Sequence, residues 1–312
     1  MPETQMTNAI DSLAWSPAGT HVAFERAGRI FYRDLLGGTV QELVQGSLPS
    51  FTPDGLQVCF GRQGRFYRVP ITGGKEEEIK ISGAWFKPDA VRSAVLSPDG
   101  KCVAFEGILL EQDRKVFLQK SFGIAHLDGT GTRKPDALAT AAQVLWAADS
   151  QRLACHSLDT RMGNTYIVNS EAERLGETTG RPLSFSPSGK RIAVSGAGNV
   201  IVYDIEKDER VGVIPYPEET EELQIPLNAP LWLDENSMVY EGGGVLLFAK
   251  INGSPSRILD LPGIVRRGVP TFYWSPRGDH FLVELVEGEE AVWSLGKYGE
   301  NKAELIALGT RL

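Results

Sequence analysis

One five-residue phrase recurs along the chain and constrains its fold more than any other feature. The phrase is an aromatic or aliphatic residue, then Ser or Thr, Pro, a variable residue and Gly, and an alternating apolar run follows it. Five copies keep this pattern: 15–19, 51–55, 96–100, 185–189 and 274–278. Two degenerate copies, 146–150 and 232–236, fill the gaps, so that the phrase returns about every 43 residues. A period of roughly 20 to 50 residues is typical of a repeat architecture.

Each copy predicts a unit of four short antiparallel strands, here called A to D in chain order. Proline pre-sets the backbone for the second position of a type I turn, and glycine at the fourth accommodates the exit from it. The phrase therefore marks the turn between strands A and B. Runs such as 21–24 and 191–194 then alternate as half-buried strands do. A third strand, a turn rich in glycine and a short fourth strand complete the unit, as at 30–32, 37–38 and 41–44.

Seven copies of four strands predict an all-β, seven-bladed β-propeller of four-stranded antiparallel blades. We expect a single domain over residues 1–312. The blades are expected at about 11–45, 48–81, 93–134, 142–176, 182–214, 229–260 and 270–309. Aromatic residues at the end of strand A should fill the space between neighbouring blades: Trp15, Trp146, Trp232 and Trp274. A solenoid is the structural alternative, which the lack of a polar capping repeat disfavours.

The repeated phrase, the strand after it and the Asp-Gly or Gly-Gly turn together resemble the repeats of the TolB-type, WD-like β-propeller family. Five of the seven copies carry the resemblance well, and all seven cover roughly residues 12–309. The similarity to WD-type repeats themselves is poorer, since Tyr203-Asp204 is the nearest match to their dipeptide. The resemblance implies the fold and no single activity, because this repeat occurs in protein-binding modules, peptidase gating domains and polysaccharide lyases.

The longest connections predict where a partner would bind. In a four-stranded blade the A–B and C–D turns lie on one face of the disc, and the B–C loops and D–A crossovers lie on the other. Every sizeable insertion belongs to the second face: 82–92, 107–121, 158–164, 215–230 and 262–267. Binding residues concentrate on long loops of a rigid scaffold. The alternative is that neutral insertions accumulate where they are tolerated.

Aromatic and basic residues in these insertions form the predicted partner-binding set. Aromatic side chains are enriched at binding hot spots, and basic ones steer association. The predicted residues are Trp85, Phe86, Arg114, Lys115, Arg266 and Arg267. The alternative for the aromatic pair is that it packs beneath its own loop.

Residues for catalysis or metal binding are not brought together by any motif in the sequence. Nucleophile elbows, HExxH, P-loops and EF-hand loops do not occur. Of the four histidines, His21 and His280 share one repeat position, which indicates a structural or solvent-facing role. His126 and His156 belong to adjacent blades. The three cysteines lie in apolar runs and are expected to be buried hydrophobic residues. We therefore predict no catalytic residues, no metal site and no cofactor.

The sequence leads to a prediction of function and setting. The net charge of −8 argues against a nucleic-acid partner, and the chain has neither a secretory leader nor an apolar run of membrane-spanning length. We expect a cytoplasmic, non-catalytic module, monomeric alone, that binds a protein or peptide through the face bearing the B–C and D–A loops. The first alternative is a propeller lyase or hydrolase acting on a carbohydrate in the central funnel, and the second is a small-molecule sensor.

The last copy contains its own fourth strand, expected at 303–308. The N-terminus is therefore not needed to complete the seventh blade. We expect residues 1–9 to be peripheral to the ring.

Overall fold

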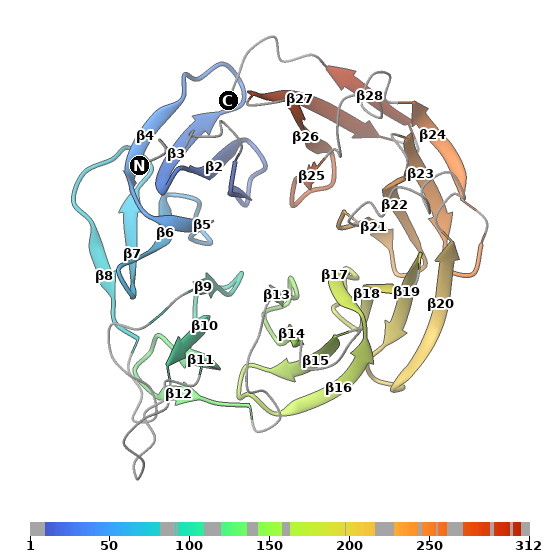
Figure 1. Ribbon diagram of the computed structural model, residues 1–312, viewed down its shortest axis with the longest axis horizontal. Coiled ribbons are helices and arrows are strands. Elements are labelled where there is room, and N and C mark those ends of the chain that lie inside the picture. The colour runs from blue at the N-terminus through green and yellow to red at the C-terminus, as the bar shows by residue number, and fades with distance from the viewer. Residues whose placement is uncertain are drawn as a thin grey trace, which may run out of the picture.

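Seven four-stranded antiparallel sheets form the protein, which confirms the predicted seven-bladed β-propeller (Figure 1). The computed structural model describes residues 10–81, 91, 93–108, 120–135, 143–157, 163–196, 198–215, 228–242, 245–253, 255–260, 271–287, 290–299 and 302–306. The described part of the chain contains no helix with the length and apolar character that crossing a membrane requires.

Each blade takes four consecutive strands of the chain. Blades one to three are β1 (Ser12–Trp15), β2 (His21–Arg26), β3 (Arg29–Asp34), β4 (Gln41–Gln45); β5 (Ser47–Phe51), β6 (Gln57–Arg62), β7 (Arg65–Pro70), β8 (Glu77–Ile79); and β9 (Ser93–Leu96), β10 (Cys102–Ile108), β11 (Lys120–His126), β12 (Gly131–Arg133). Blades four and five are β13 (Gln143–Trp146), β14 (Arg152–Ser157), β15 (Asn164–Asn169), β16 (Arg174–Thr179); and β17 (Arg181–Phe185), β18 (Arg191–Gly196), β19 (Asn199–Asp204), β20 (Glu209–Pro215). Blades six and seven are β21 (Leu231–Asp234), β22 (Ser237–Gly242), β23 (Val245–Lys250), β24 (Ser256–Asp260); and β25 (Thr271–Trp274), β26 (His280–Glu287), β27 (Glu290–Gly299), β28 (Lys302–Ile306).

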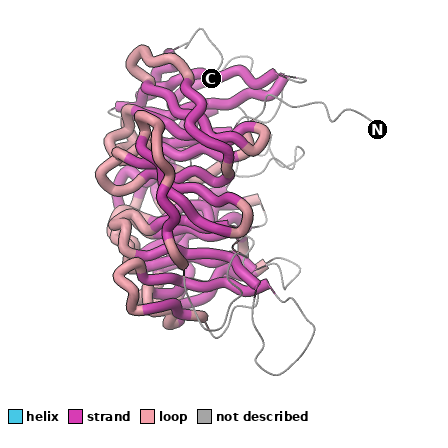
Figure 2. Tube along the Cα trace, turned by 90° about the vertical axis from the view of Figure 1, so that its left-hand side faces the viewer, coloured by secondary structure: helices cyan, strands magenta, loops and turns pink. Residues whose placement is uncertain are grey.

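The blades are arranged around a central axis, with strand A of each blade innermost and strand D at the rim (Figure 1). Seen edge-on, the molecule is a disc whose strands run through its thickness (Figure 2). Strands also occupy both ends of the segment 107–121 that the sequence predicts as a loop, because β10 continues to Ile108 and β11 begins at Lys120.

The hydroxyl of the repeated phrase joins the A–B turn to the start of strand B. In the third blade, Ser97 Oγ accepts from the backbone N–H of Cys102 at 2.9 Å and donates to Asp99 Oδ1 at 2.7 Å. The N–H of Gly100 donates to the carbonyl of Ser97, and Gly100 has φ +72°, a conformation that favours glycine. The equivalent hydroxyls also accept from the residue five positions later: Ser16, Thr52, Ser186 and Ser275.

The tryptophans of strand A lie between blades, as the sequence predicts. The indole N–H of Trp146 donates to the carbonyl of Val95 in the preceding blade at 3.2 Å. The indole of Trp232 likewise reaches Ser184 Oγ in the blade before it, at 3.1 Å. A large apolar ring with one satisfied donor can therefore fill the narrow inner space between two sheets.

In the part of the chain that the structure describes, contacts between side chains and backbone close the ring. All four strands of the last sheet, β25 to β28, come from the C-terminal part of the chain. Across the seam, the N–H of Ile10 donates to Glu284 Oε1 at 3.1 Å. Within the seventh blade, the hydroxyl of Tyr273 lies 3.3 Å from Glu284 Oε2. Ile10 packs with Phe24 and Leu282. Residues 1–9 lie outside the described residues, so their peripheral role stays a prediction.

Carboxylates at the same position of strand B connect other neighbouring blades. Glu25 Oε2 accepts from the N–H of Leu48 in the second blade at 2.9 Å. Glu241 accepts from the amide group of Asn228, whose oxygen in turn accepts from the N–H of Phe272 in the seventh blade. In both cases, a backbone N–H group in strand A of the next blade gains a hydrogen-bond acceptor.

The buried seam predicts a pH dependence of stability. Burial raises the pKa of Glu284, with the charge of Asp11 adding to the effect, so the folded protein holds this proton more tightly than the unfolded chain. The stability gained from the proton is complete below the ordinary glutamate pKa and is lost as the pH rises through the higher pKa of the folded state. Between about pH 5 and about pH 8, the free energy of unfolding of the wild type should therefore fall more than that of Glu284→Gln.

Glutamine keeps a side-chain oxygen to accept from Ile10, so the variant is expected to fold. Urea denaturation of both proteins across this pH range measures the difference. Parallel pH profiles for the two proteins would show that Glu284 does not titrate as the seam predicts.

Candidate functional site

A polar cleft of about 400 Å³ opens between the third and fourth blades. Its lining comes from the A–B and C–D turns of these two blades, on the turn face of the disc. The residues are Asp99, Gly100, Lys101, Cys102, His126, Leu127, Asp128, Ser150, Gln151 and Ser170. The cleft is therefore on the turn face, and not on the face that the sequence predicts as the binding surface.

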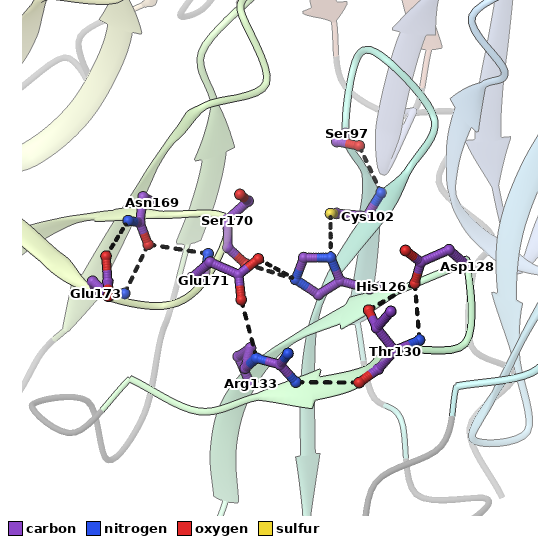
Figure 3. A network of polar contacts seen from close by, with 10 residues as sticks. All are labelled: Ser97, Cys102, His126, Asp128, Thr130, Arg133, Asn169, Ser170, Glu171 and Glu173. Carbon is purple, nitrogen blue, oxygen red and sulfur yellow. Dashed lines mark hydrogen bonds and ion pairs between the residues drawn. The ribbon is translucent and has the colours of Figure 1, made fainter.

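A cysteine and a histidine meet at one side of the cleft (Figure 3). Cys102 begins β10 and His126 ends β11, and the two are direct partners across these strands. Cys102 Sγ lies 3.6 Å from His126 Nδ1, and His126 Nε2 lies 3.0 Å from the carbonyl oxygen of Ser170 in the fourth blade. A carbonyl can only accept, so Nε2 carries the hydrogen, and in the neutral ring Nδ1 accepts from the thiol. The imidazole thus bridges two blades.

The surroundings of Cys102 disfavour a thiolate. Burial raises the pKa of its thiol to about 11, and the charges of Asp99, Glu171 and Asp128 act in the same direction. A nucleophilic cysteine needs the opposite, a lowered pKa beside positive charge. The thiol of Cys102 therefore stays protonated at neutral pH and is not an activated nucleophile.

Two carboxylates of the third blade remain ionised at the cleft. Burial acts to raise the pKa of Asp99, but hydrogen bonds from Ser97 and from the N–H of Lys101 outweigh it and lower the pKa. The N–H and the hydroxyl of Thr130 both donate to Asp128 Oδ1 and lower its pKa as well. Both groups carry a negative charge at neutral pH, which makes the cleft rich in hydrogen-bond acceptors.

A departure from the repeat brings a hydroxyl to the cleft. Ser150 occupies the position at which five copies of the phrase have glycine, and it keeps the left-handed conformation with φ +60°. Its Oγ accepts from the N–H of Asp99 in the third blade at 3.0 Å. This conformation costs a residue with a side chain of the order of 1 kcal/mol, and the hydrogen bond between blades offsets part of that cost.

A second set of contacts fixes the fourth-blade wall. Glu171 lies beside the imidazole, with its Oε1 3.5 Å from His126 Nε2, and its Oε2 accepts from Nε of Arg133 at 3.1 Å. The side chain of Asn169 holds this turn by accepting from the N–H groups of Glu171 and Glu173 (Figure 3). Hydrogen bonds within and between the turns therefore set the shape of the cleft.

Among the residues that the structure describes, no three His, Cys, Asp or Glu side chains come together in a way that could hold a metal ion. His126 and His156 lie in adjacent blades, as the sequence predicts, but at opposite ends of their sheets. His156 is buried at the end of β14, and its burial lowers its pKa.

All six predicted partner-binding residues lie outside the described residues: Trp85, Phe86, Arg114, Lys115, Arg266 and Arg267. Their role stays a prediction. Sequence reasoning did not find the cleft. Two signals point toward it: Ser150 replaces a repeat glycine, and Cys102 and His126 stand at the ends of adjacent strands of one blade.

Comparison with known proteins supports the fold. No protein-family model matches the chain, and no curated protein matches its sequence. Among solved structures, an oligogalacturonate lyase in complex with manganese is 14% identical with a TM-score of 0.61, over 92% of this chain and 88% of that one. A chain of a mitotic checkpoint complex is 11% identical with a TM-score of 0.64, over 96% and 93%.

TolB from Acinetobacter baumannii is 20% identical over 65% of this chain and 53% of that one, with a TM-score of 0.46 that supports no further argument. At these identities the likeness shows a β-propeller and no particular activity. Membership of the TolB-type repeat family stays a prediction.

The raised pKa of Cys102 predicts how its thiol reacts. Alkylation by iodoacetamide should be slow at neutral pH and should quicken about tenfold per pH unit up to about pH 9, because only the thiolate reacts. Mass spectrometry of the modified protein measures the rate. Cys102→Ser is the control, since Cys59 and Cys155 are fully buried. A rate that levels off near pH 8 would contradict the description of the site.

Proposed function

We propose that the protein is a non-catalytic interaction module that binds a protein or peptide partner, with the cleft between the third and fourth blades as a recognition site. The arrangement of the Cys102–His126 pair carries the proposal. Burial keeps its thiol protonated at neutral pH, so the sulfur is not set up for nucleophilic attack, and its imidazole joins the two blades. The acceptors at the cleft are ionised and open to solvent.

The fixed shape of the cleft supports recognition. The bonds from Asp99 to Ser150 and from His126 to Ser170 cross between the two blades that form its walls. A pre-ordered site loses little conformational entropy when a ligand binds. Both walls are formed by short turns, and the backbone hydrogen bonds of these turns recur in the equivalent turns of other blades.

Selection of peptides from a random display library tests the proposal. We expect enriched peptides to lose at least tenfold in affinity for Gln151→Trp, which places an indole at the mouth of the cleft without changing a buried residue. Leu56→Trp is the matched control, because Leu56 has the same place in the turn of the second blade and is exposed. Equal binding to both variants would contradict the cleft as the recognition site.

The non-catalytic part of the proposal has a separate test. The lyase of similar fold has manganese in its structure. Cleavage of oligogalacturonate by the purified protein with Mn²⁺ present would contradict a purely binding role, and the proposal expects no turnover above buffer.

The loop face is a second proposed surface, and it rests on the sequence alone. If Trp85 and Phe86 are anchors there, changing both to alanine should weaken partner binding by about 2 kcal/mol or more while leaving fold stability intact. Titration calorimetry with a selected peptide and thermal unfolding measure the two effects. A loss of stability would favour the alternative that the pair packs beneath its own loop.

A further inference from the structure

We propose that the cleft between the third and fourth blades receives the cationic side chain of a lysine or arginine presented by a partner peptide. The assignment rests on the proposed function and names the chemistry that the partner must bring. Four observations carry it: the sign of the local charge, the oxygen atoms left for a ligand, a cation already present at the rim, and the size of the recess.

Negative charge dominates around the cleft. Asp99 and Asp128 lie on the two turns of the third blade, and Glu171 faces them from the fourth. Burial is the largest cause of the raised pKa of the Cys102 thiol, and each of the three carboxylates raises it by more than Lys101 lowers it. Arg133 offsets only Glu171, with which it is paired.

The turn hydrogen bonds of both third-blade carboxylates use their Oδ1 atoms, while the carboxylate of Asp99 also has the Ser150 hydroxyl and Lys101 beside it. The hydrogen bonds from Ser97 and Lys101 N both end on Asp99 Oδ1, and those from Thr130 both end on Asp128 Oδ1. The Oδ2 atom of Asp128 can therefore accept from an ammonium or guanidinium group, and that of Asp99 can do so when Lys101 moves away. Charge-assisted hydrogen bonds of this kind are about twice as strong as those between neutral groups.

A cation of the protein itself already stands at the rim. The ammonium Nζ of Lys101 lies 3.7 Å from Asp99 Oδ2, while its side chain is 80% exposed. Such an exposed pair contributes little stability. A partner's cation can displace this ammonium at low cost, because Lys101 then returns to water.

The cleft is large enough to receive a lysine or arginine side chain. Ligand sites typically enclose about 300 to 1,000 Å³, and this cleft is at the small end at about 400 Å³. The rim residues Lys101, Asp128 and Gln151 are exposed on the turn face, where the backbone of a peptide can lie across them. These features allow a residue of a peptide to enter the cleft, and a free polyamine is the alternative that the experiments distinguish.

The first experiment measures peptide binding directly. The probes are fluorescent heptapeptides with one central Arg, Lys, Gln or Glu among neutral residues, titrated by anisotropy. We expect the Arg and Lys peptides to bind at least tenfold more tightly than the Gln peptide. The double variant Asp99→Asn with Asp128→Asn should abolish this preference. Asparagine retains Oδ1 for the turn hydrogen bonds, so the variant is expected to fold.

Asp54→Asn is the matched control. Asp54 has the same turn position in the second blade and accepts from Thr52 Oγ1 and from the N–H of Leu56. It does not line the cleft. Binding that falls equally in this variant would contradict the proposal.

The second experiment measures the electrostatic potential at Cys102 without a peptide. Cys102 is modified with a cationic trimethylammonium-ethyl thiosulfonate and with its anionic sulfonatoethyl counterpart, and the ratio of the two rates is taken. We expect the cationic reagent to react at least tenfold faster, and the ratio to fall about tenfold in the double asparagine variant. Because both reagents need the thiolate, its abundance cancels in the ratio. A ratio of one or below would overturn the inference.

The outcomes separate this inference from the proposed function. Library peptides that need the open cleft but no basic residue would overturn the inference and leave the interaction module standing. Failure of every peptide to bind would count against both. Spermidine that binds as tightly as the Arg peptide would overturn the assignment to a peptide side chain and indicate a small polycation instead.

Discussion

The arrangement of the turn face depends on one hydroxyl, which five of the seven repeated phrases contain. In the third blade Ser97 accepts from the first N–H of strand B and donates to the carboxylate of Asp99. One small side chain therefore sets both where strand B begins and where the charge of the turn lies. Since the same bond to strand B recurs at Thr52 and in three further blades, the turns share a shape and differ only in what their side chains offer.

The cleft lies where the regular turns of the third and fourth blades contain residues that depart from the repeated pattern. The turns present Asp99 and Cys102 at fixed places in the third blade, and Ser150 enters at a position that favours glycine in the fourth. His126 then joins the two blades through Ser170. Functional sites often break a rule that the surrounding sequence obeys. Here the break adds a hydroxyl and a bridging imidazole, while the neighbouring turns keep their ordinary hydrogen bonds.

The fold could be predicted from sequence because its determinants are local. Pro and Gly in the phrase specify a turn within five residues, and the alternating runs specify strands beside it. The packing of Trp146 between blades follows from its place at the end of strand A. The cleft could not be predicted in the same way, because Cys102, His126 and Ser170 meet only through strand register and the contact between two blades. The left-handed conformation of Ser150 could not be predicted either, because its copy of the phrase, 146–150, departs from the repeated pattern.

Hydrogen–deuterium exchange with a selected peptide bound tests the central claim, recognition at the turn-face cleft, most directly. Exchange reports which backbone amides become protected without any substitution in the protein. The account predicts that protection concentrates in the turns around Asp99, Asp128 and Ser150, with the equivalent turns of the first and second blades unchanged. Protection that leaves these turns unaffected and falls elsewhere on the disc would contradict it.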